Sequence, residues 1–251
     1  MQVSCIIPFY NEAKRLPAVV GALKEVSLKE IILVDDGSTD SSHLFFEDTR
    51  VHLIRFENNK GKAAALFAGF WEAKGDIILF LDADLTGLTA SHVNELLAPV
   101  LYQNANVSLG LREYYNFFDV VGGERVLVKS EWLTFFSAEL FYNNAIEIGM
   151  DRYILLKDLT VTCVKLKGVR QTHKTSKLGL VRGMGTDIYY VMDWMWQLGI
   201  FSFSCTYILF WWLIIQKEGR LLNQCKKLYQ HMFAKKFSYL LFQPTDLRPL
   251  V

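Results

Sequence analysis

Residues 76–85 read DIILFLDADL, an apolar run that predicts a buried strand and places Asp82 and Asp84 at its end. One residue separates the two aspartates, so on an extended chain their side chains point the same way, roughly 6–7 Å apart. Two carboxylates in such a place are costly unless something binds them. One can ligate a divalent cation while the other reaches a bound water or a ligand hydroxyl. Either could instead cap the next helix, but Thr89 and Ser91 are available for that role.

Apolar runs of this kind recur along the chain, and segments with apolar residues every three or four positions separate them. The predicted strands are 3–7, 30–35, 51–56, 76–82 and 106–111, and the predicted helices are 12–26, 41–49, 61–75 and 91–103. This alternation predicts an α/β fold with a mostly parallel central sheet and helices on both faces. A loop (112–123), a strand (124–129), one or two helices (130–157) and a strand (159–169) follow. We expect one catalytic domain over residues 1–190.

The charge balance excludes some partners. Lys and Arg number 27 against 26 Asp and Glu, a net charge of +1 that gives no reason to expect a nucleic acid partner. The four cysteines have no CxxC or zinc-finger spacing, so we expect reduced thiols in a cytosolic setting rather than disulfides or a zinc site. The first predicted strand starts at residue 3, which leaves no room for a signal peptide in front of it.

The C-terminal part has a different character. Residues 198–215 carry no charge, tryptophans lie near both ends, and both flanks are basic. This pattern favours a membrane hairpin, a re-entrant segment or an in-plane amphipathic helix over a single span, while a buried helix or a dimer interface is the alternative. We expect residues 191–251 to form an apolar and basic helical appendage that associates with the membrane, with the catalytic domain on the cytoplasmic face.

Three predicted strands end in polar clusters. The strand at 3–7 leads into PFYNE (8–12), the strand at 30–35 into DDGSTD (35–40), and the strand at 76–82 into DADL. Ligands of open parallel sheets bind beyond the carboxyl ends of the strands, so the three clusters predict one binding site.

The second cluster can contact a ligand directly. Gly37 lets the backbone come close to a ligand, and Asp35 or Asp36 can accept hydrogen bonds from a base or a ribose; the alternative is a plain Asp-Gly turn. No G-x-G-x-x-G or G-x-x-x-x-G-K-[ST] motif is present, so a metal ion would have to take over the binding of phosphates.

These motifs together resemble the family-2 glycosyltransferases with the GT-A fold. The resemblance rests on VSCIIPFYNE, IILVDDGSTD, ENNKGKAAALFAGFWEAKGDIILFLDADL and GGERVLVK over about the first 130 residues. The segments IEIGMDRYI and GVRQTHK extend it to about residue 174. It implies an enzyme of the hexosyltransferase type that moves a sugar from a UDP- or GDP-sugar to an acceptor, with inversion and with Mn²⁺ or Mg²⁺. The Q-x-x-R-W signature of processive synthases is absent, so a polymerising activity is not expected.

The resemblance also implies roles for individual residues. Asp36 would hydrogen-bond the base, Lys62 would lie near the nucleotide, and Asp82 would contact the ribose or the sugar. Asp84 would ligate the metal ion, with His173 completing its site. The remaining assignments are a nucleotide pocket lined by Pro8, Tyr10 and Glu12 and a catalytic base at Glu147, with Asp151 as the second choice.

The acceptor is left open by the sequence. A hydroxyl acceptor needs a base such as Glu147, whereas a lipid phosphate arrives ionised and needs none. Residues 165–182 contain six basic and no acidic residues, a cationic face suited to a phosphate or an anionic membrane surface. With the apolar tail, this favours a lipid-linked or membrane-proximal acceptor, as in the synthesis of cell-envelope glycans or glycolipids, over a soluble glycan.

Two other functions fit parts of the sequence. DADLT satisfies the D-x-D-x-T motif of haloacid-dehalogenase-like phosphatases, in which Asp82 would be the nucleophile and Asp84 the acid/base, but no acidic pair follows residue 84 to bind magnesium. A non-catalytic, membrane-tethered protein that binds nucleotide sugars is the other alternative. It predicts a broken metal motif, whereas Asp36, Asp82 and Asp84 are all present.

Overall fold

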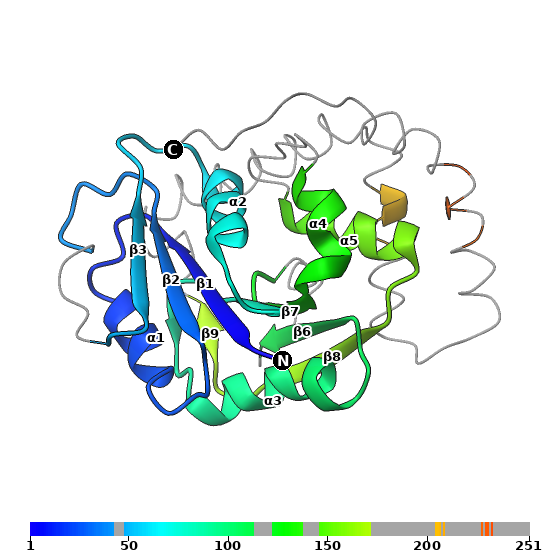
Figure 1. The fold of residues 1–251 in the computed structure, drawn as a ribbon, viewed down its shortest axis with the longest axis horizontal. Helices are drawn as coiled ribbons and strands as arrows, with labels where there is room; N and C mark the ends of the chain where they lie inside the picture. The colour runs from blue at the N-terminus through cyan, green and yellow to red at the C-terminus, as the bar shows by residue number, and fades with distance from the viewer. Residues whose placement is uncertain are drawn as a thin grey trace.

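The computed structural model describes residues 1–42, 48–112, 122–137 and 146–171, together with 204–206, 208, 227, 229–230 and 232. These residues form an α/β fold around a seven-stranded sheet (Figure 1). Its strands, in the order in which they lie across the sheet, are β3 (Val51–Arg55), β2 (Glu30–Asp35), β1 (Val3–Phe9), β4 (Ile77–Phe80), β7 (Arg125–Val128), β6 (Val107–Arg112) and β8 (Val161–Leu166).

The sheet is mostly parallel, as predicted. Strands β3, β2, β1 and β4 run parallel to one another, and β6 runs parallel to β8. Strand β7 is antiparallel to both of its neighbours, β4 and β6, which the sequence did not reveal. A second, two-stranded antiparallel sheet joins β5 (Leu85–Thr86) to β9 (Arg170–Gln171).

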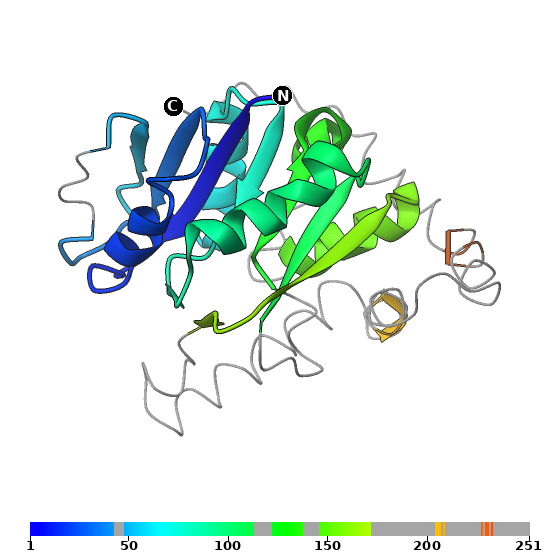
Figure 2. The same ribbon diagram turned by 90° about the horizontal axis from the view of Figure 1, so that it is seen from below.

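Helices cover both faces of the central sheet, because its strands expose apolar side chains on both sides. Helices α2 (Lys62–Glu72), α4 (Lys129–Ser137) and α5 (Ile146–Lys157) pack on one face, with Ile6, Ile78 and Phe80 of the sheet. Helices α1 (Leu16–Ala22) and α3 (Ala90–Tyr102) pack on the other, with Ile7 and Leu79. Figure 2 shows α1 and α3 in front of the sheet. Successive residues of a strand point to opposite faces, which explains the two separate cores.

The predicted elements that the structure describes differ from the observed ones mainly at their ends, and most of the predicted helix 41–49 lies outside the described residues. Helix α1 is shorter than its prediction (12–26), and the segment 130–157 contains two helices, α4 and α5. Strand β8 forms within the predicted strand 159–169, and the short β9 follows directly after it. Cys5, Cys163 and Cys205 carry free thiols, and Cys225 lies outside the described residues.

The predicted membrane segment falls mostly outside the described residues. Of 198–215, the structure describes 204–206 and 208, and of the wider tail a few further residues. Among the residues described, none belongs to a helix with the length and apolar character needed to cross a membrane. Membrane association through 198–215 therefore stays a prediction.

Candidate functional site

The three polar clusters lie at one edge of the sheet. Strands β1, β2 and β4 are parallel neighbours, with Phe9 beside Asp35 and Ile6 beside Phe80. The backbone N–H of Asp36 donates to the carbonyl of Phe9 at 2.9 Å, which continues the pairing past the end of β2. The carboxyl ends of these strands therefore meet at the edge where α/β sheets bind ligands.

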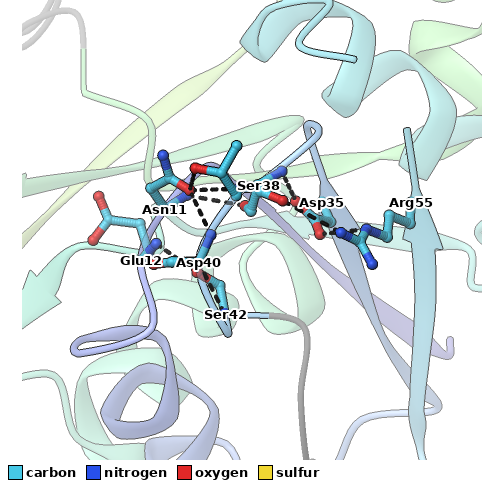
Figure 3. Close-up of polar contacts among 8 residues, drawn as sticks. Asn11, Glu12, Asp35, Ser38, Asp40, Ser42 and Arg55 are labelled. Atoms are coloured by element: carbon cyan, nitrogen blue, oxygen red, sulfur yellow. Dashed lines mark hydrogen bonds and ion pairs between the residues drawn. The ribbon is translucent and has the colours of Figure 1, made fainter. Parts of the chain in front are cut away.

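The loops that follow β1 and β2 are tied together (Figure 3). The side-chain oxygen of Asn11 accepts hydrogen bonds from the backbone N–H groups of Thr39 (2.8 Å) and Asp40 (3.2 Å). In return, the backbone N–H of Glu12 donates to the hydroxyl of Ser42 at 2.8 Å. Asn11 has a positive φ of 54°, a conformation that Asn adopts more readily than most residues. The two loops thus form one cross-linked wall.

Asp35 and Gly37 shape the turn in this wall. The Asp35 carboxylate is fully buried, accepts a hydrogen bond from the backbone N–H of Ser38 at 2.7 Å, and lies 3.3 Å from Nε of Arg55 (Figure 3). Gly37 has φ +77°, and a Cβ there would lie 2.7 Å from the backbone of Asn58. Only glycine fits this turn without strain. Asp35 therefore faces the protein rather than the open edge of the site.

Asp36 points to the start of α2. Its two carboxylate oxygens accept hydrogen bonds from the backbone N–H groups of Lys60 (2.7 Å) and Gly61 (2.9 Å). Burial raises the pKa of Asp36, and these two N–H donors partly oppose that shift. Each oxygen keeps a second lone pair, so Asp36 can still accept a hydrogen bond from a ligand.

The other three predicted pocket residues lie in β1 or directly after it. Pro8 is buried within β1, opposite Val34 of β2. Tyr10 is 44% exposed, and Glu12 is buried with its carboxylate 2.6 Å from Nε of Arg15. Tyr10 therefore offers the most accessible surface of the three.

Asp82 and Asp84 converge on one point. The side-chain amide nitrogen of Gln171 donates to a carboxylate oxygen of Asp82 at 3.0 Å and to one of Asp84 at 3.1 Å. Both aspartates are buried. Neither caps α3, because Thr89 forms a capping box with His92. Pairing of Leu85 in β5 with Gln171 in β9 brings the glutamine to the motif from 87 residues away.

This convergence fits a divalent cation. Two acidic oxygens aimed at a single point are the ligands that Mg²⁺ and Mn²⁺ prefer, and a cation held by few protein ligands keeps open positions for diphosphate oxygens. Across the described ranges, no group of three or more His, Cys, Asp and Glu could hold a metal. The predicted third ligand, His173, lies outside the described residues.

Lys62 connects the aspartate pair to Glu147. Its ammonium lies 2.6 Å from an oxygen of Asp82 and 2.7 Å from an oxygen of Glu147. Burial favours the neutral amine, but the two carboxylates outweigh it and hold the pKa of Lys62 well above its usual value. Lys62 is therefore charged at neutral pH. It begins α2, and Glu147 lies in the first turn of α5, so two helix starts build this cluster.

Asp151 lies behind Glu147, one helical turn further along α5. It is 2% exposed, and its carboxylate lies 2.6 Å from a guanidinium nitrogen of Arg125. Burial raises the pKa of Asp151 to about 7, with Arg125 opposing the shift and Glu147 adding to it. Of the two predicted base candidates, the structure brings only Glu147 into contact with Lys62.

Sequence reasoning missed four residues of this site. Gly123 is one, because a Cβ there would overlap the Asp82 carboxylate. Gln171 and Arg112 are two more, with the guanidinium of Arg112 donating to the side-chain oxygen of Gln171. The fourth is Glu124, fully buried and 4.0 Å from Arg112. The only signals in the sequence were the GGER and GVRQTHK stretches, which assigned no role to these four residues.

Comparison with known proteins assigns the family. A family model described as "Glycosyl transferase family 2" matches residues 4–164, more than half of the chain. The chain is a member of this family. The predicted resemblance is thereby confirmed, and the alternative of a haloacid-dehalogenase-like phosphatase, a class outside this family, is disfavoured.

Curated relatives of this family 2 glycosyltransferase match it over a limited stretch. An undecaprenyl-phosphate 4-deoxy-4-formamido-L-arabinose transferase of Pseudomonas fluorescens is 42% identical over 94 residues, which are 33% of this chain and 28% of the relative. The enzyme of the same name from Proteus mirabilis is 40% identical over 95 residues, 34% of this chain and 29% of the relative. The match thus spans less than a third of the length of these relatives.

Solved structures confirm the GT-A fold. Glucosyl-3-phosphoglycerate synthase from Mycobacterium tuberculosis, in complex with Mn²⁺, UDP and phosphoglyceric acid, superimposes with a TM-score of 0.64 and 18% identity over 79% of this chain and 78% of that chain. The same enzyme with Mg²⁺ and UDP gives the same TM-score. At this identity the likeness shows the fold alone.

Proposed function

We propose that this protein transfers a sugar from a UDP- or GDP-sugar to a lipid-linked or membrane-proximal acceptor, with Mn²⁺ or Mg²⁺ held by Asp84 and Asp82. The observation that supports this most strongly is the convergence of the two carboxylates on one point, 3.0 and 3.1 Å from a single nitrogen. The cross-linked loops that carry Asn11 and Asp36 lie along the same sheet edge. The donor's nucleotide would lie along these loops, and its diphosphate would reach the aspartate pair.

Donor binding draws on the loops after β1 and β2. Asp36 keeps a lone pair on each oxygen for a base N–H or a ribose hydroxyl. Gly37 allows close approach of the nucleotide, and Asp35 holds the turn that positions both. The exposed ring of Tyr10 can stack on the base, with Pro8 and Glu12 behind it.

The chemical step places negative charge on the departing diphosphate. A bound cation would neutralise part of that charge, which is the usual dominant contribution to catalysis of such reactions. Lys62 adds a second positive charge beside Asp82, and it is held charged by two carboxylates. We expect Asp82 also to contact the ribose or the sugar. Attack from the opposite side of the sugar inverts the anomeric carbon.

The need for a base depends on the acceptor. Glu147 can accept a proton from a hydroxyl acceptor through its carboxylate, one oxygen of which lies 2.7 Å from the Lys62 ammonium. A lipid phosphate arrives ionised, and Glu147 then serves to position Lys62.

Two observations favour a lipid phosphate as acceptor. The curated relatives are named for undecaprenyl phosphate. In this chain Lys165, Lys167 and Arg170 are exposed on β8 and β9 or between them, and β9 pairs with the strand that continues from Asp84. An anionic acceptor at this side would meet these cations close to the aspartate pair.

A transfer assay tests the proposal. The purified chain is incubated with a panel of UDP- and GDP-sugars, a polyprenyl phosphate in detergent and Mn²⁺, and glycolipid formation is measured. Asp84→Ala should abolish metal-dependent transfer while the melting temperature changes little, and Glu95→Gln, an exposed carboxylate of α3, should be unaffected.

Two results would contradict the proposal. An Asp84→Ala variant that retained most of its transfer activity would remove Asp84 from the site. Binding of nucleotide sugars without turnover, across lipid, glycan and small-molecule acceptors, would support the alternative of a non-catalytic binding protein.

A further inference from the structure

A neutral side chain lies at the point on which the two aspartates converge. The amide nitrogen of Gln171 donates to Asp82 at 3.0 Å and to Asp84 at 3.1 Å. The orientation of this amide is decided by its other end, because the side-chain oxygen of Gln171 accepts from the guanidinium of Arg112. The reversed amide would set its oxygen against two carboxylates and its NH₂ against a guanidinium. A cation and this NH₂ group cannot contact the two carboxylates at one point.

The backbone of Gln171 is fixed, so its side chain is the part that can move. Residue 171 pairs with Leu85, and the hydroxyl of Thr86 donates to the carbonyl of Arg170 at 3.2 Å. The turns beside the two strands are in close contact, because a Cβ on Gly87 would lie 2.5 Å from the carbonyl oxygen of Gly168. Rotation about the side-chain bonds of Gln171 therefore provides the way to clear the aspartates without breaking the β5–β9 pairing.

Glu124 is the second, independent feature. Its side chain is fully buried, and within the described part of the chain no other residue donates a hydrogen bond to either carboxylate oxygen. A guanidinium nitrogen of Arg112 lies 4.0 Å from one oxygen, too far for a hydrogen bond. A buried carboxylate is costly when no other residue donates a hydrogen bond to it, and the ion pair with Arg112 does not supply that hydrogen bond. Arg112, the cation nearest to it, is the same group that contacts Gln171.

We propose that Gln171 is a displaceable cover of the cation site, coupled to Glu124 through Arg112. When a divalent cation binds Asp82 and Asp84, the amide of Gln171 leaves the two carboxylates and Arg112 moves about 1 Å to hydrogen-bond Glu124. The inference rests on the proposed cation site. It makes Gln171, Arg112 and Glu124 positioning residues that set the affinity for the metal ion rather than residues that touch the reacting atoms.

The coupling predicts opposite effects of two substitutions on metal affinity. A site that is covered part of the time binds more weakly, in proportion to the fraction of time it is open. Gln171→Ala removes the cover, so Mn²⁺ should bind about tenfold more tightly. Glu124→Gln removes the charge that attracts Arg112 away from the cover, so Mn²⁺ should bind about tenfold more weakly.

Combining the substitutions separates the coupling from simple electrostatics. Removing a buried negative charge near Asp82 could weaken Mn²⁺ binding without any movement of Arg112. In that case the effect of Glu124→Gln would be the same with and without Gln171. The coupling predicts that Glu124→Gln has little effect once Gln171 is alanine, a non-additivity that a double-mutant cycle measures directly.

The experiment uses Mn²⁺ alone, without donor or acceptor, and the full chain. Free Mn²⁺ is measured by electron paramagnetic resonance during titration of wild type, the two single variants, the double variant and Gln103→Ala, an exposed glutamine at the end of α3. Circular dichroism melts verify that each variant is folded. The expected order of affinity is Gln171→Ala above wild type and Gln103→Ala, with Glu124→Gln lowest.

The outcomes separate this inference from the proposed function. If wild type binds Mn²⁺, Asp84→Asn does not, and Gln171→Ala binds no more tightly than wild type, the cover is overturned and the cation site stands. If the effects of Glu124→Gln and Gln171→Ala are additive, the link through Arg112 is overturned. If no variant binds Mn²⁺, both the cover and the proposed cation site are overturned.

Discussion

Lys62→Met tests how the site is held together. Lys62 is the shared counter-charge of Asp82 and Glu147, which are largely buried beside it. Methionine keeps the aliphatic length of lysine but removes the ammonium group that both carboxylates contact. We therefore expect a loss of stability, in contrast to the neutral effect of most surface substitutions.

The expected loss of stability can be estimated from the contacts of Lys62 with Asp82 and Glu147. A hydrogen bond to a charged group contributes about 1.5–3 kcal/mol, but exposed ion pairs contribute less than about 1 kcal/mol. The Lys62 side chain is 33% exposed and its partners are 11% exposed, so each contact lies between these limits. Together they amount to about 2 kcal/mol, which corresponds to a fall of about 4–8 °C in melting temperature for a chain of this size.

Urea denaturation at pH 7.5, followed by circular dichroism, measures the change. The pKa of Lys62 is raised in the folded state, so its contribution is fully present below its ordinary pKa of 10.5 and is lost only as the pH rises through the higher folded-state value. The difference in free energy of unfolding between wild type and Lys62→Met should therefore be constant from neutral pH to about pH 9. Lys62→Arg keeps the charge and is the matched control.

A double variant distinguishes a loss of stability caused by the missing charge from one caused by poorer packing. In Lys62→Met combined with Glu147→Gln, one of the two carboxylates that lose their contact with Lys62 is neutral, so about half of the lost stability should return. A Lys62→Met variant as stable as wild type, or a double variant with no recovery, would refute the ion-pair account of this cluster.

Three further predictions concern other parts of the chain. Phe136→Ala should lower the free energy of unfolding by about 3–5 kcal/mol in urea denaturation, because this ring is buried and stacked in the core under α4, and unchanged stability would contradict that packing. Gly37→Ala forces a side chain into the left-handed region and against the backbone of the next loop, so UDP or GDP should bind at least tenfold more weakly by calorimetry, and wild-type affinity would separate this turn from the nucleotide. Asp48→Asn tests the ion pair between Arg50 and Asp48. The hydrogen bonds from Arg50 lower the pKa of Asp48 to about 2. The pair therefore stabilises the fold above about pH 4 and loses this effect as the pH falls toward 2. The variant should be less stable by no more than about 1 kcal/mol at pH 7, with a difference that disappears in acid, and a gap that persisted at pH 2 would rule out the carboxylate as its source.

The edge of the sheet at which the site lies was predictable from the sequence. Continuous apolar runs identify strands buried on both faces, and such strands occur in parallel sheets whose carboxyl ends share an edge. The polar clusters that follow 3–7, 30–35 and 76–82 could thus be placed together before any coordinates. The structure adds that Asp35 holds its own turn, whereas Asp36 faces the loop before α2.

The contact of Gln171 with the aspartate pair, and the contacts of Arg112 behind it, were not predictable. Gln171 reaches Asp84 only because two-residue strands pair across 84–86 positions of sequence, and strands that short have no periodicity to detect. Glu124 and Arg112 flank a segment read as a loop, and the antiparallel direction of β7 decides that they face each other. Local patterns predict which segments form strands, but not the order or direction in which they pair.

The predictions for His173 and for residues 198–215 lie outside the described residues, apart from 204–206 and 208. They remain predictions about metal binding and membrane association. Detergent dependence of the purified protein and the effect of His173→Ala on Mn²⁺ affinity address them separately.

Calorimetric titration of UDP and GDP, with and without Mn²⁺, tests the central claim most directly. The proposed site predicts that one of the two nucleotides binds in the presence of Mn²⁺ and that EDTA or Asp84→Asn weakens this binding at least a hundredfold. Equal affinity with and without the metal ion, or full affinity in Asp84→Asn, would contradict a cation held at the ends of these strands.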